Sequence, residues 1–374
     1  MLQRGNDASF AFEQEANFLY LTGINAPNWQ AIIDGQNNKE WLVAPDIDAA
    51  HQIFDGCLSW DEARQMSGIE NVITPKQADE LLTELSHHNQ TIYTLGKDPH
   101  AGHYDFHENP AGQTMRRHLK KYFTNIKDCR SELAKLRAIK QPEEIVAIRR
   151  AIAITHKSFA DVKKLLPTLH HEYEAEAEFT YRFRKSGARG HAYDPIVAGG
   201  KNACTLHYND NQAALPKNGL LLIDIGARVD GYAADITRTY AIGTPTDRQI
   251  AVHAAVENAQ QQIILLLRPG LSVAEYHEKV DDIMTNALIS LKLMKSRDDT
   301  TNYRKYFPHS ISHGLGIDVH DSLGKPDAFK AGMVLTVEPG IYIPEEGIGV
   351  RIEDDILITD TGCENLSAAL ATSL

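Results

Sequence analysis

The chain has 374 residues, of which 43% are hydrophobic and 24% charged, and its formal net charge is −12. This length allows two domains, and the composition is typical of a soluble globular protein. The acidic balance, without any basic run or basic helix, argues against nucleic acid as the main partner.

Membrane and disulfide signals are weak in this sequence. No apolar stretch approaches the ~18 residues that a membrane-crossing helix needs, and the start MLQRGNDASF has no signal-peptide core. The four cysteines, Cys57, Cys129, Cys204 and Cys363, lie far apart and form no CxxC pair. This usage suits a reducing compartment and excludes a cysteine-rich zinc site. We therefore expect a cytoplasmic protein.

Residues 1–127 predict an α/β domain of modest size. No glycine loop of the nucleotide-binding type interrupts this part of the chain. Alternating apolar runs predict strands, and longer periodic patterns predict helices. The expected strands are 18–24 (FLYLTGI), 40–45 (EWLVAP) and 91–96 (TIYTLG), and the expected helices are 76–87 and 110–122.

The pattern changes near residues 131–142, where a long amphipathic helix begins. Pro142 lies in its opening turn with Glu143 and Glu144 directly after it, and both features are helix-start signals. Long helices then alternate with pairs of strands up to the C-terminus. The helices are expected at 143–165, 172–187, 247–267 and 272–293. Because the order is not strictly βαβ, this part predicts an α+β domain with an antiparallel sheet.

The stretch LLLIDIGARVDGYAADITRTY contains two acids in apolar surroundings, Asp224 and, eleven residues later, Asp235. Asp230 and Gly231 between them form a hairpin-turn signal. A turn at 229–231 would fold the flanking strands together and bring the two acids opposite or diagonal to each other. Two facing carboxylates repel each other unless they share a cation.

Two further acids, Glu338 and Glu353, interrupt the strand-like stretch VLTVEPGIYIPEEGIGVRIEDDILIT, and His309, His313 and His320 lie in FPHSISHGLGIDVHD. A buried carboxylate is costly unless a cation lies beside it. Two divalent ions would neutralise the four carboxylates. Carboxylate-rich ligation with one imidazole suits Mn²⁺, Co²⁺, Fe²⁺ or Zn²⁺, and two such ions about 3.5–4 Å apart hold a shared hydroxide as a nucleophile.

The order D-x10-D, then H, E and E resembles the ligand set of the pita-bread metallopeptidases, a group that holds methionine aminopeptidases, prolidases, aminopeptidase P and creatinase. The similarity to the aminopeptidase P family extends over nearly the whole chain. In the first part of the chain, the stretch FAFEQEANFLYLTG resembles the signature of the family's first domain. Its later part is similar in KQPEEIVAIRRA, SGARGHAYDPIVAGGKNACTLHY, LIDIGARVDGYAADITRTY, SHGLGIDVHD, MVLTVEPGIYI and GIGVRIEDDI.

This resemblance implies an α+β protein with a pita-bread catalytic domain at 136–374 and a smaller α/β domain of the aminopeptidase P type at 1–127. Longer relatives carry extra residues before the segment that matches RGNDASF, so the first domain is expected to be shortened at its start. Glu13 stands where an arginine is usual. A homodimer or homotetramer is also implied.

The resemblance assigns metal ligands residue by residue. Asp224 would bind one ion, Asp235 and Glu353 would bridge both ions, and His313 and Glu338 would complete the other site. Mn²⁺ is the foremost candidate among the divalent metals.

Five further residues match positions of the family's substrate pocket. His320 would contact the scissile peptide and assist proton transfer. From the residues alone, the arginine could instead pair with an acid such as Asp354, and the tyrosine could simply pack in its strand. The five pocket residues are His207, His309, His320, Tyr342 and Arg351.

Three functions fit these features. An Xaa-Pro aminopeptidase would release an N-terminal residue that precedes proline. A prolidase would cut only Xaa-Pro dipeptides, but short prolidases carry an arginine four residues after the histidine matching His320, where this chain has Gly324 and then Lys325. Long prolidases carry an insertion between the two glutamates that this chain lacks. The third function is a non-catalytic binding module of the same fold. Methionine aminopeptidase is disfavoured because it lacks a first domain of this type.

Overall fold

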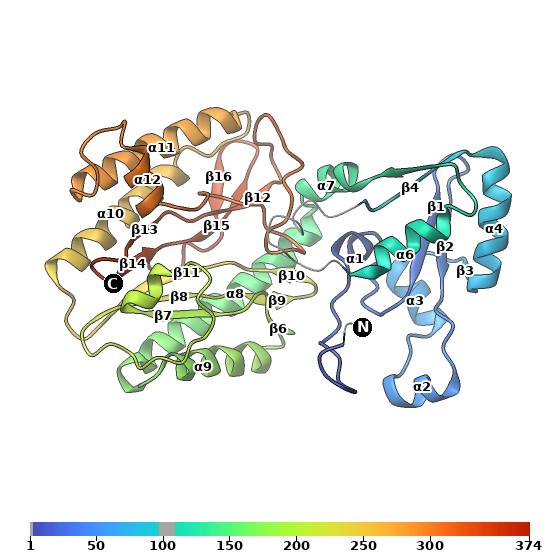
Figure 1. The fold of residues 1–374 in the computed structure, drawn as a ribbon, viewed down its shortest axis with the longest axis horizontal. Helices are drawn as coiled ribbons and strands as arrows, with labels where there is room; N and C mark the ends of the chain where they lie inside the picture. Colours follow the sequence, from blue (N-terminus) through green and yellow to red (C-terminus); the bar gives the residue numbers. More distant parts are fainter. Residues whose placement is uncertain (1–2, 97–108) are drawn as a thin grey trace. The chain divides into compact units, whose positions relative to one another are not determined.

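The computed structural model describes residues 3–96 and 109–374 of the chain. The chain divides into two compact units, Met1–Leu133 and Ala134–Leu374 (Figure 1). Among the described residues, no helix is both long enough and apolar enough to cross a membrane.

The first unit contains a three-stranded sheet in the order β1-β2-β3, in which β1 and β2 are antiparallel and β2 and β3 are parallel. A separate parallel pair is formed by β4 and β5. The elements are α1 (Ala16–Thr22), β1 (Gln30–Asp34), β2 (Lys39–Val43), α2 (Ala49–Asp55), α3 (Trp60–Ser67), β3 (Val72–Ile73), α4 (Pro75–His88), β4 (Thr91–Thr94), α6 (Pro110–Leu119), β5 (Asn125–Asp128) and α7 (Arg130–Ala138), which continues into the second unit.

The predicted strand at 18–24 is wrong, because this segment forms the helix α1. The aromatic and β-branched residues of FLYLT favour a strand locally. Specific caps at both ends decide otherwise. The Glu15 side chain accepts a hydrogen bond from the Phe18 backbone N–H, and Gly23 closes the helix in the left-handed region with φ 69°. End capping therefore outweighs the weak intrinsic preference of the residues between the caps.

The second unit contains the longer helices and most of the strands. Its first helix starts with Pro142, as the sequence predicts. The elements are α8 (Pro142–Leu165), η1 (Leu166–Thr168), α9 (Glu172–Lys185), β6 (Gly190–His191), β7 (Ile196–Gly199), η2 (Gly200–Cys204), β8 (Gly219–Asp224), β9 (Ala227–Val229), β10 (Tyr232–Ala233), β11 (Thr237–Ile242), α10 (Asp247–Ile264), α11 (Val273–Ser290), α12 (Thr300–Tyr306), β12 (Val334–Val337), β13 (Gly340–Ile343), β14 (Ile348–Arg351), β15 (Asp354–Ile358) and β16 (Cys363–Asn365).

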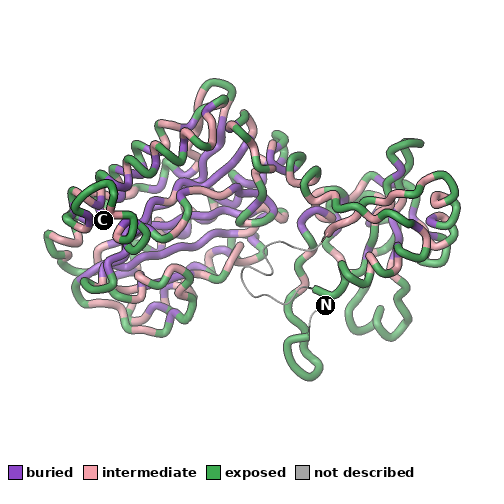
Figure 2. Tube along the Cα trace, turned by 45° about the horizontal axis from the view of Figure 1, so that its top comes forward, coloured by how far each residue is buried: buried purple, intermediate pink, exposed green. Residues whose placement is uncertain are grey.

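Every strand pair that the structure describes in this unit is antiparallel, which confirms the predicted α+β class. The main sheets have the strand orders β11-β8-β7 and β12-β15-β16, and β13 pairs with β14. The strands are buried along most of their length (Figure 2).

Two apolar cores fix these sheets. Helices α8 and α9 pack on β7, β8 and the β9–β10 hairpin, with Phe159 and Phe179 fully buried among them. Helices α10, α11 and α12 pack on β12 to β15, with Tyr276 and Met284 at their centre. Figure 1 shows the strands of this unit running between the two groups of helices. Acids at the strand ends are thereby carried into the interior.

The predicted turn at 229–231 is present between β9 and β10. Asp230 and Gly231 both have positive φ, 51° and 87°, as a two-residue hairpin turn requires. The following strand returns along β8 with Thr237 opposite Asp224. Asp235 therefore lies two residues from the partner of Asp224, on a diagonal.

Candidate metal centre

Three side chains of the second unit converge on one point. Asp235 precedes β11, His313 lies in the segment after α12, and Glu353 stands between β14 and β15. Each offers a ligand atom, and these atoms all lie within 4.8 Å of one another. Glu338, directly after β12, lies beside them with its Oε1 3.6 Å from His313 Nε2. The arrangement combines carboxylate oxygens with one imidazole nitrogen.

Strand pairing explains why residues so far apart in sequence meet here. Val337 pairs with Asp354 across β12 and β15, so the neighbouring Glu338 and Glu353 emerge at the same end of the two strands. The Glu353 backbone N–H donates to the Thr237 carbonyl at 3.1 Å, which ties this end to the start of β11. The Thr237 hydroxyl donates to Glu353 Oε2 at 2.7 Å and orients the carboxylate.

The carboxylates of this cluster are strongly perturbed without a cation. Burial raises the pKa of Glu353, and the charges of Asp235 and Glu338 raise it further. Burial also raises the pKa of Asp235, an effect that its contact with His313 only partly offsets. Burial raises the pKa of Glu338 to about 7. Acids in such surroundings need a positive partner to be ionised at neutral pH.

His313 is oriented as a ligand of a cation would be. Its Nδ1 lies 3.0 Å from the Gly314 carbonyl oxygen, an acceptor, so Nδ1 carries a proton and Nε2 is the nitrogen that a metal ion would bind after losing its own proton. Nε2 points to Asp235 Oδ2 at 3.4 Å. Burial alone would lower the pKa of His313, but the contact with Asp235 and the charge of Glu338 raise it to about 9.

The donor set therefore fits divalent cations. Acids that are buried and mutually repulsive, together with an imidazole whose Nε2 faces them, form a site that divalent cations would stabilise. Oxygen-rich ligation with one nitrogen is the chemistry of Mn²⁺, Co²⁺, Fe²⁺ or Zn²⁺ sites.

We predict that metal removal destabilises the protein more strongly at high pH. Because the pKa of Glu338 is raised from 4.5 to about 7, its ionisation lowers the folding stability of the metal-free protein as pH rises through this range. A raised imidazole pKa means that the stability contributed by His313 is lost as pH rises from 6.5 through about 9. Both effects have the same sign, and bound metal removes both because it requires deprotonated ligands.

Thermal melting of chelated and Mn²⁺-reloaded protein between pH 5 and pH 9 checks this prediction. The gap between the two melting temperatures should widen as pH rises. Buried histidines far from the cluster titrate alike in the chelated and the Mn²⁺-reloaded protein. Their contribution therefore cancels from the difference between the two melting temperatures. A gap that narrows or stays constant would contradict the predicted role of these residues.

Asp224 lies next to the three-donor cluster and is held by two other side chains. Its Oδ1 accepts a hydrogen bond from the Tyr193 hydroxyl at 2.5 Å, and its Oδ2 is 2.6 Å from Arg351 Nη2. Pairing of Arg351 with Asp354, the alternative left open by the sequence, is wrong: Asp354 pairs with Arg238 at 2.6 Å. Arg351 thus pairs with an acid of the candidate site, Asp224.

Arg351 also begins a chain of hydrogen bonds along one side of the site. Its Nη1 donates to the Tyr342 hydroxyl at 2.7 Å, and that hydroxyl lies 2.9 Å from His309 Nε2. His309 Nδ1 lies 2.7 Å from the Ser310 carbonyl oxygen, so it holds the proton and Nε2 accepts from Tyr342. Burial, and then the charge of Arg351, lowers the pKa of His309 to about 4. This histidine is neutral at physiological pH.

The remaining two pocket histidines lie at the edge of the site. The His320 ring is exposed and tilted against His313, with 4.1 Å between the ring centroids. His207 is exposed as well, and its charge adds to the effects of burial and of Arg351 that lower the pKa of His309. Neither of them belongs to the three converging donors.

Tyr193 and Asp355 were missed by the sequence reasoning. Asp355 is fully buried, and its Oδ2 accepts the Asp235 backbone N–H at 3.2 Å, which fixes the backbone of that residue. Two further acids directly after Glu353 were the available signal, since a run of acids in an apolar strand needs partners. Tyr193 stands in the stretch HAYDP, and nothing local sets it apart from a packing residue.

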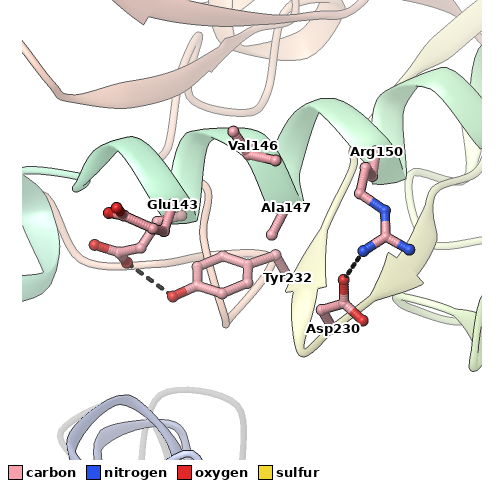
Figure 3. A pocket seen from close by; sticks show the side chains of 7 residues that line it. Glu143, Val146, Ala147, Arg150, Asp230 and Tyr232 are labelled. Carbon is pink, nitrogen blue, oxygen red and sulfur yellow. Dashed lines mark hydrogen bonds and ion pairs between the residues drawn. The ribbon is translucent and has the colours of Figure 1, made fainter.

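A separate hollow of about 290 Å³ lies beside the start of α8. Four of its polar side chains are engaged in pairs: the Tyr232 hydroxyl donates to Glu144 at 2.9 Å, and Arg150 pairs with Asp230 (Figure 3). It shares no residue with the carboxylate cluster. We therefore place the candidate site at the cluster.

Comparison with known families identifies the chain. Residues 146–360, more than half of its length, match the model of metallopeptidase family M24, and residues 2–93 match the N-terminal domain of aminopeptidase P. This chain belongs to metallopeptidase family M24. The resemblance seen in the sequence motifs is confirmed for both parts of the chain.

Several relatives of this chain are named as Xaa-Pro aminopeptidases. The Xaa-Pro aminopeptidase of Escherichia coli (strain K12) is 34% identical, in a match covering 98% of this chain and 88% of the relative. A putative aminopeptidase P from Bacillus anthracis has a similar structure, with TM-score 0.88, 32% identity and coverage of 98% and 88%. Aminopeptidase P from E. coli with the inhibitor Pro-Leu is similar too, with TM-score 0.85, 31% identity and coverage of 99% and 89%.

Proposed function

We propose that this chain is a metal-dependent Xaa-Pro aminopeptidase, which hydrolyses the bond between an N-terminal residue and a following proline. The observation that carries the proposal is the convergence of Asp235, His313 and Glu353 in a buried, acid-rich site. The M24 match and the named relatives supply the reaction class and the substrate class. The aminopeptidase P type of N-terminal domain favours this function over prolidase.

We propose five residues as ligands of two divalent ions, with Mn²⁺ as the metal. Asp235 and Glu353 would bridge the ions, with Asp224 on one side and His313 and Glu338 on the other. Divalent ions in such a site lower the pKa of water and polarise a carbonyl oxygen. Tyr193 and Arg351 would hold the Asp224 carboxylate in place through its two oxygens.

Protein side chains would position the substrate and move its protons. His320, whose ring is tilted against that of His313, can donate a hydrogen bond to the scissile peptide and supply a proton to the leaving proline nitrogen. Neutral His309, held by Tyr342 and Arg351, forms a rigid wall of the pocket. The proline ring would lie between this wall and His207.

Prolidase activity is the second candidate, and the loop after His320 argues against it. A dipeptidase needs a cation directly beyond proline to hold the product carboxylate. Gly324 has φ +72°, and a side chain there would meet Lys135 Cα at 3.0 Å, so this position cannot accept an arginine without strain. Lys325 is exposed. The inhibitor Pro-Leu of the E. coli relative has a residue after proline, which also favours an open pocket.

We predict a preference for longer peptides. The kcat/KM for Xaa-Pro-Yaa tripeptides should exceed that for the matching Xaa-Pro dipeptide, because nothing in the loop at Gly324 supplies a carboxylate clamp. Peptides without proline in second place should be poor substrates. A panel of these peptides with Mn²⁺, Co²⁺ and Zn²⁺ in turn measures both effects.

Preference for dipeptides would overturn the aminopeptidase proposal in favour of prolidase. In that case the variant Lys325→Ala tests whether Lys325 turns toward the product carboxylate. Purified protein that binds no metal and cleaves none of the peptides would instead support a non-catalytic binding module.

We also propose a cytoplasmic location and a homodimer or homotetramer. The location is supported by the four cysteines, which are all unpaired. The assembly is supported only by the family resemblance, and light scattering after size-exclusion chromatography would test it.

A further inference from the structure

The segment from Gly199, the last residue of β7, to Ala213 is here called the His207 loop. It carries a proposed pocket residue, and between β7 and β8 its only helix or strand is the short η2. Such a loop needs an anchor if it is to hold a side chain at a fixed place. The anchor lies in α9, whose first residue, Glu172, is fully buried.

The Glu172 carboxylate binds the His207 loop on both sides of His207. Two donors precede the histidine and two follow it. The four hydrogen bonds come from the Gly199 backbone N–H (2.8 Å) and Asn202 Nδ2 (3.0 Å) to Oε1, and from the Tyr208 hydroxyl (2.8 Å) and the Ala213 backbone N–H (3.0 Å) to Oε2.

This carboxylate has hydrogen-bond donors as partners, and none of the ion pairs in the described part of the chain involves it. A buried carboxylate of this kind is stable only while all its donors stay in place. The four donors are therefore coupled, and the loop between them is held as one unit.

The other face of the His207 loop packs on the strand that leads to Arg351. A side chain at Gly349 would meet the Ala203 carbonyl oxygen at 2.3 Å, so β14 and the loop are in direct backbone contact. The Cys204 thiol donates to the Ile348 carbonyl at 3.4 Å, and Ala203 packs in one apolar cluster with Tyr342. The loop is thus clamped between α9 and the strand that carries the pocket arginine.

We propose that Glu172 is a positioning residue of the active site, which fixes His207 at the pocket edge where the substrate's proline is held. The inference rests on the proposed aminopeptidase function for the role of His207. The hydrogen bonds of Glu172 to the loop are independent of that function.

The test is a double-mutant cycle of Glu172→Gln and His207→Ala in the metal-loaded enzyme. Glutamine has nearly the same volume as glutamate, but its NH₂ group would face hydrogen-bond donors of the His207 loop and could not accept from them. The substitution therefore breaks the attachment of the loop to α9 with little change in volume. We expect kcat/KM for an Xaa-Pro-Yaa tripeptide to fall about 10- to 100-fold, since misplacement by about 1 Å costs up to about 10²-fold. Bound metal should stay at the wild-type level. The kcat/KM of the double variant should be no lower than that of the less active single variant, because both changes act through His207.

Glu178→Gln is the matched control. Glu178 lies on the same helix and pairs with Arg182, so its replacement should leave kcat/KM unchanged. Hydrogen exchange of peptides from 199–213 gives a readout that does not depend on activity. Exchange should quicken in Glu172→Gln and stay unchanged in Glu178→Gln.

Additive losses in the cycle, loss of metal in Glu172→Gln, or unchanged exchange in the loop would each overturn the proposal. If Glu172→Gln does not fold, Tyr208→Phe removes a single donor, and the same cycle with His207→Ala decides the question. Wild-type protein that cleaves no Xaa-Pro peptide would refute the proposed function itself, while hydrogen exchange would still show whether Glu172 anchors the loop.

Discussion

Replacing Glu353 with glutamine should abolish turnover while the fold is retained. A neutral amide cannot bridge two cations, whereas its oxygen can still accept the hydrogen bond from Thr237. We expect metal content to fall and kcat/KM to drop by more than about 10²-fold, the upper end of what an outer-shell partner costs. Asp235→Asn should behave alike because both acids belong to the converging donors. Metal analysis beside steady-state kinetics measures the two effects.

A second readout separates this loss from a folding defect. Burial and neighbouring acids penalise the ionised Glu353 in metal-free protein, since they raise its pKa. Metal-free Glu353→Gln should therefore melt no lower than metal-free wild type at pH 8. Glu364→Gln is the control, because that half-exposed carboxylate pairs with Arg149 away from the cluster. Near-normal turnover of Glu353→Gln with full metal content would show that the bridging role is misassigned.

Replacing His320 with alanine should lower kcat without loss of metal. The ring lies against His313 but is not one of the converging donors. If it donates to the reacting peptide, its loss should cost about 10²–10⁴-fold in kcat, the usual range for general acid–base help. Binding of the substrate should change less, so KM should move by a smaller factor. Steady-state kinetics with metal analysis of the same preparation decides between the roles.

His277→Ala supplies the matched control for this variant. His277 is exposed on α11, and its removal should leave kcat and metal content as in wild type. Loss of one metal ion in His320→Ala would make His320 a ligand and would remove the basis for assigning that role to His313. Unchanged kcat would exclude His320 from the reaction.

The sequence by itself predicted the class of the fold and much of its local structure. Pro142 with the two following glutamates marked the start of α8, and Asp230–Gly231 marked the turn between β9 and β10. Such signals are local: they depend on backbone dihedrals and on capping within a few residues. The same local reasoning failed at α1, where the Glu15 and Gly23 caps outweighed a strand-like composition.

The sequence also singled out acids that apolar strands cannot hold without a partner. The sequence did not indicate which side chain pairs with each buried charged residue. Arg351 lies only two residues before Glu353 and three before Asp354, yet it pairs with Asp224, which lies on another strand. Glu172 reads as an ordinary helix-start acid, yet it holds the His207 loop. Hydrogen bonds and ion pairs of buried groups form between segments that only sheet pairing and helix packing bring together. For that reason their partners were decided by the tertiary structure.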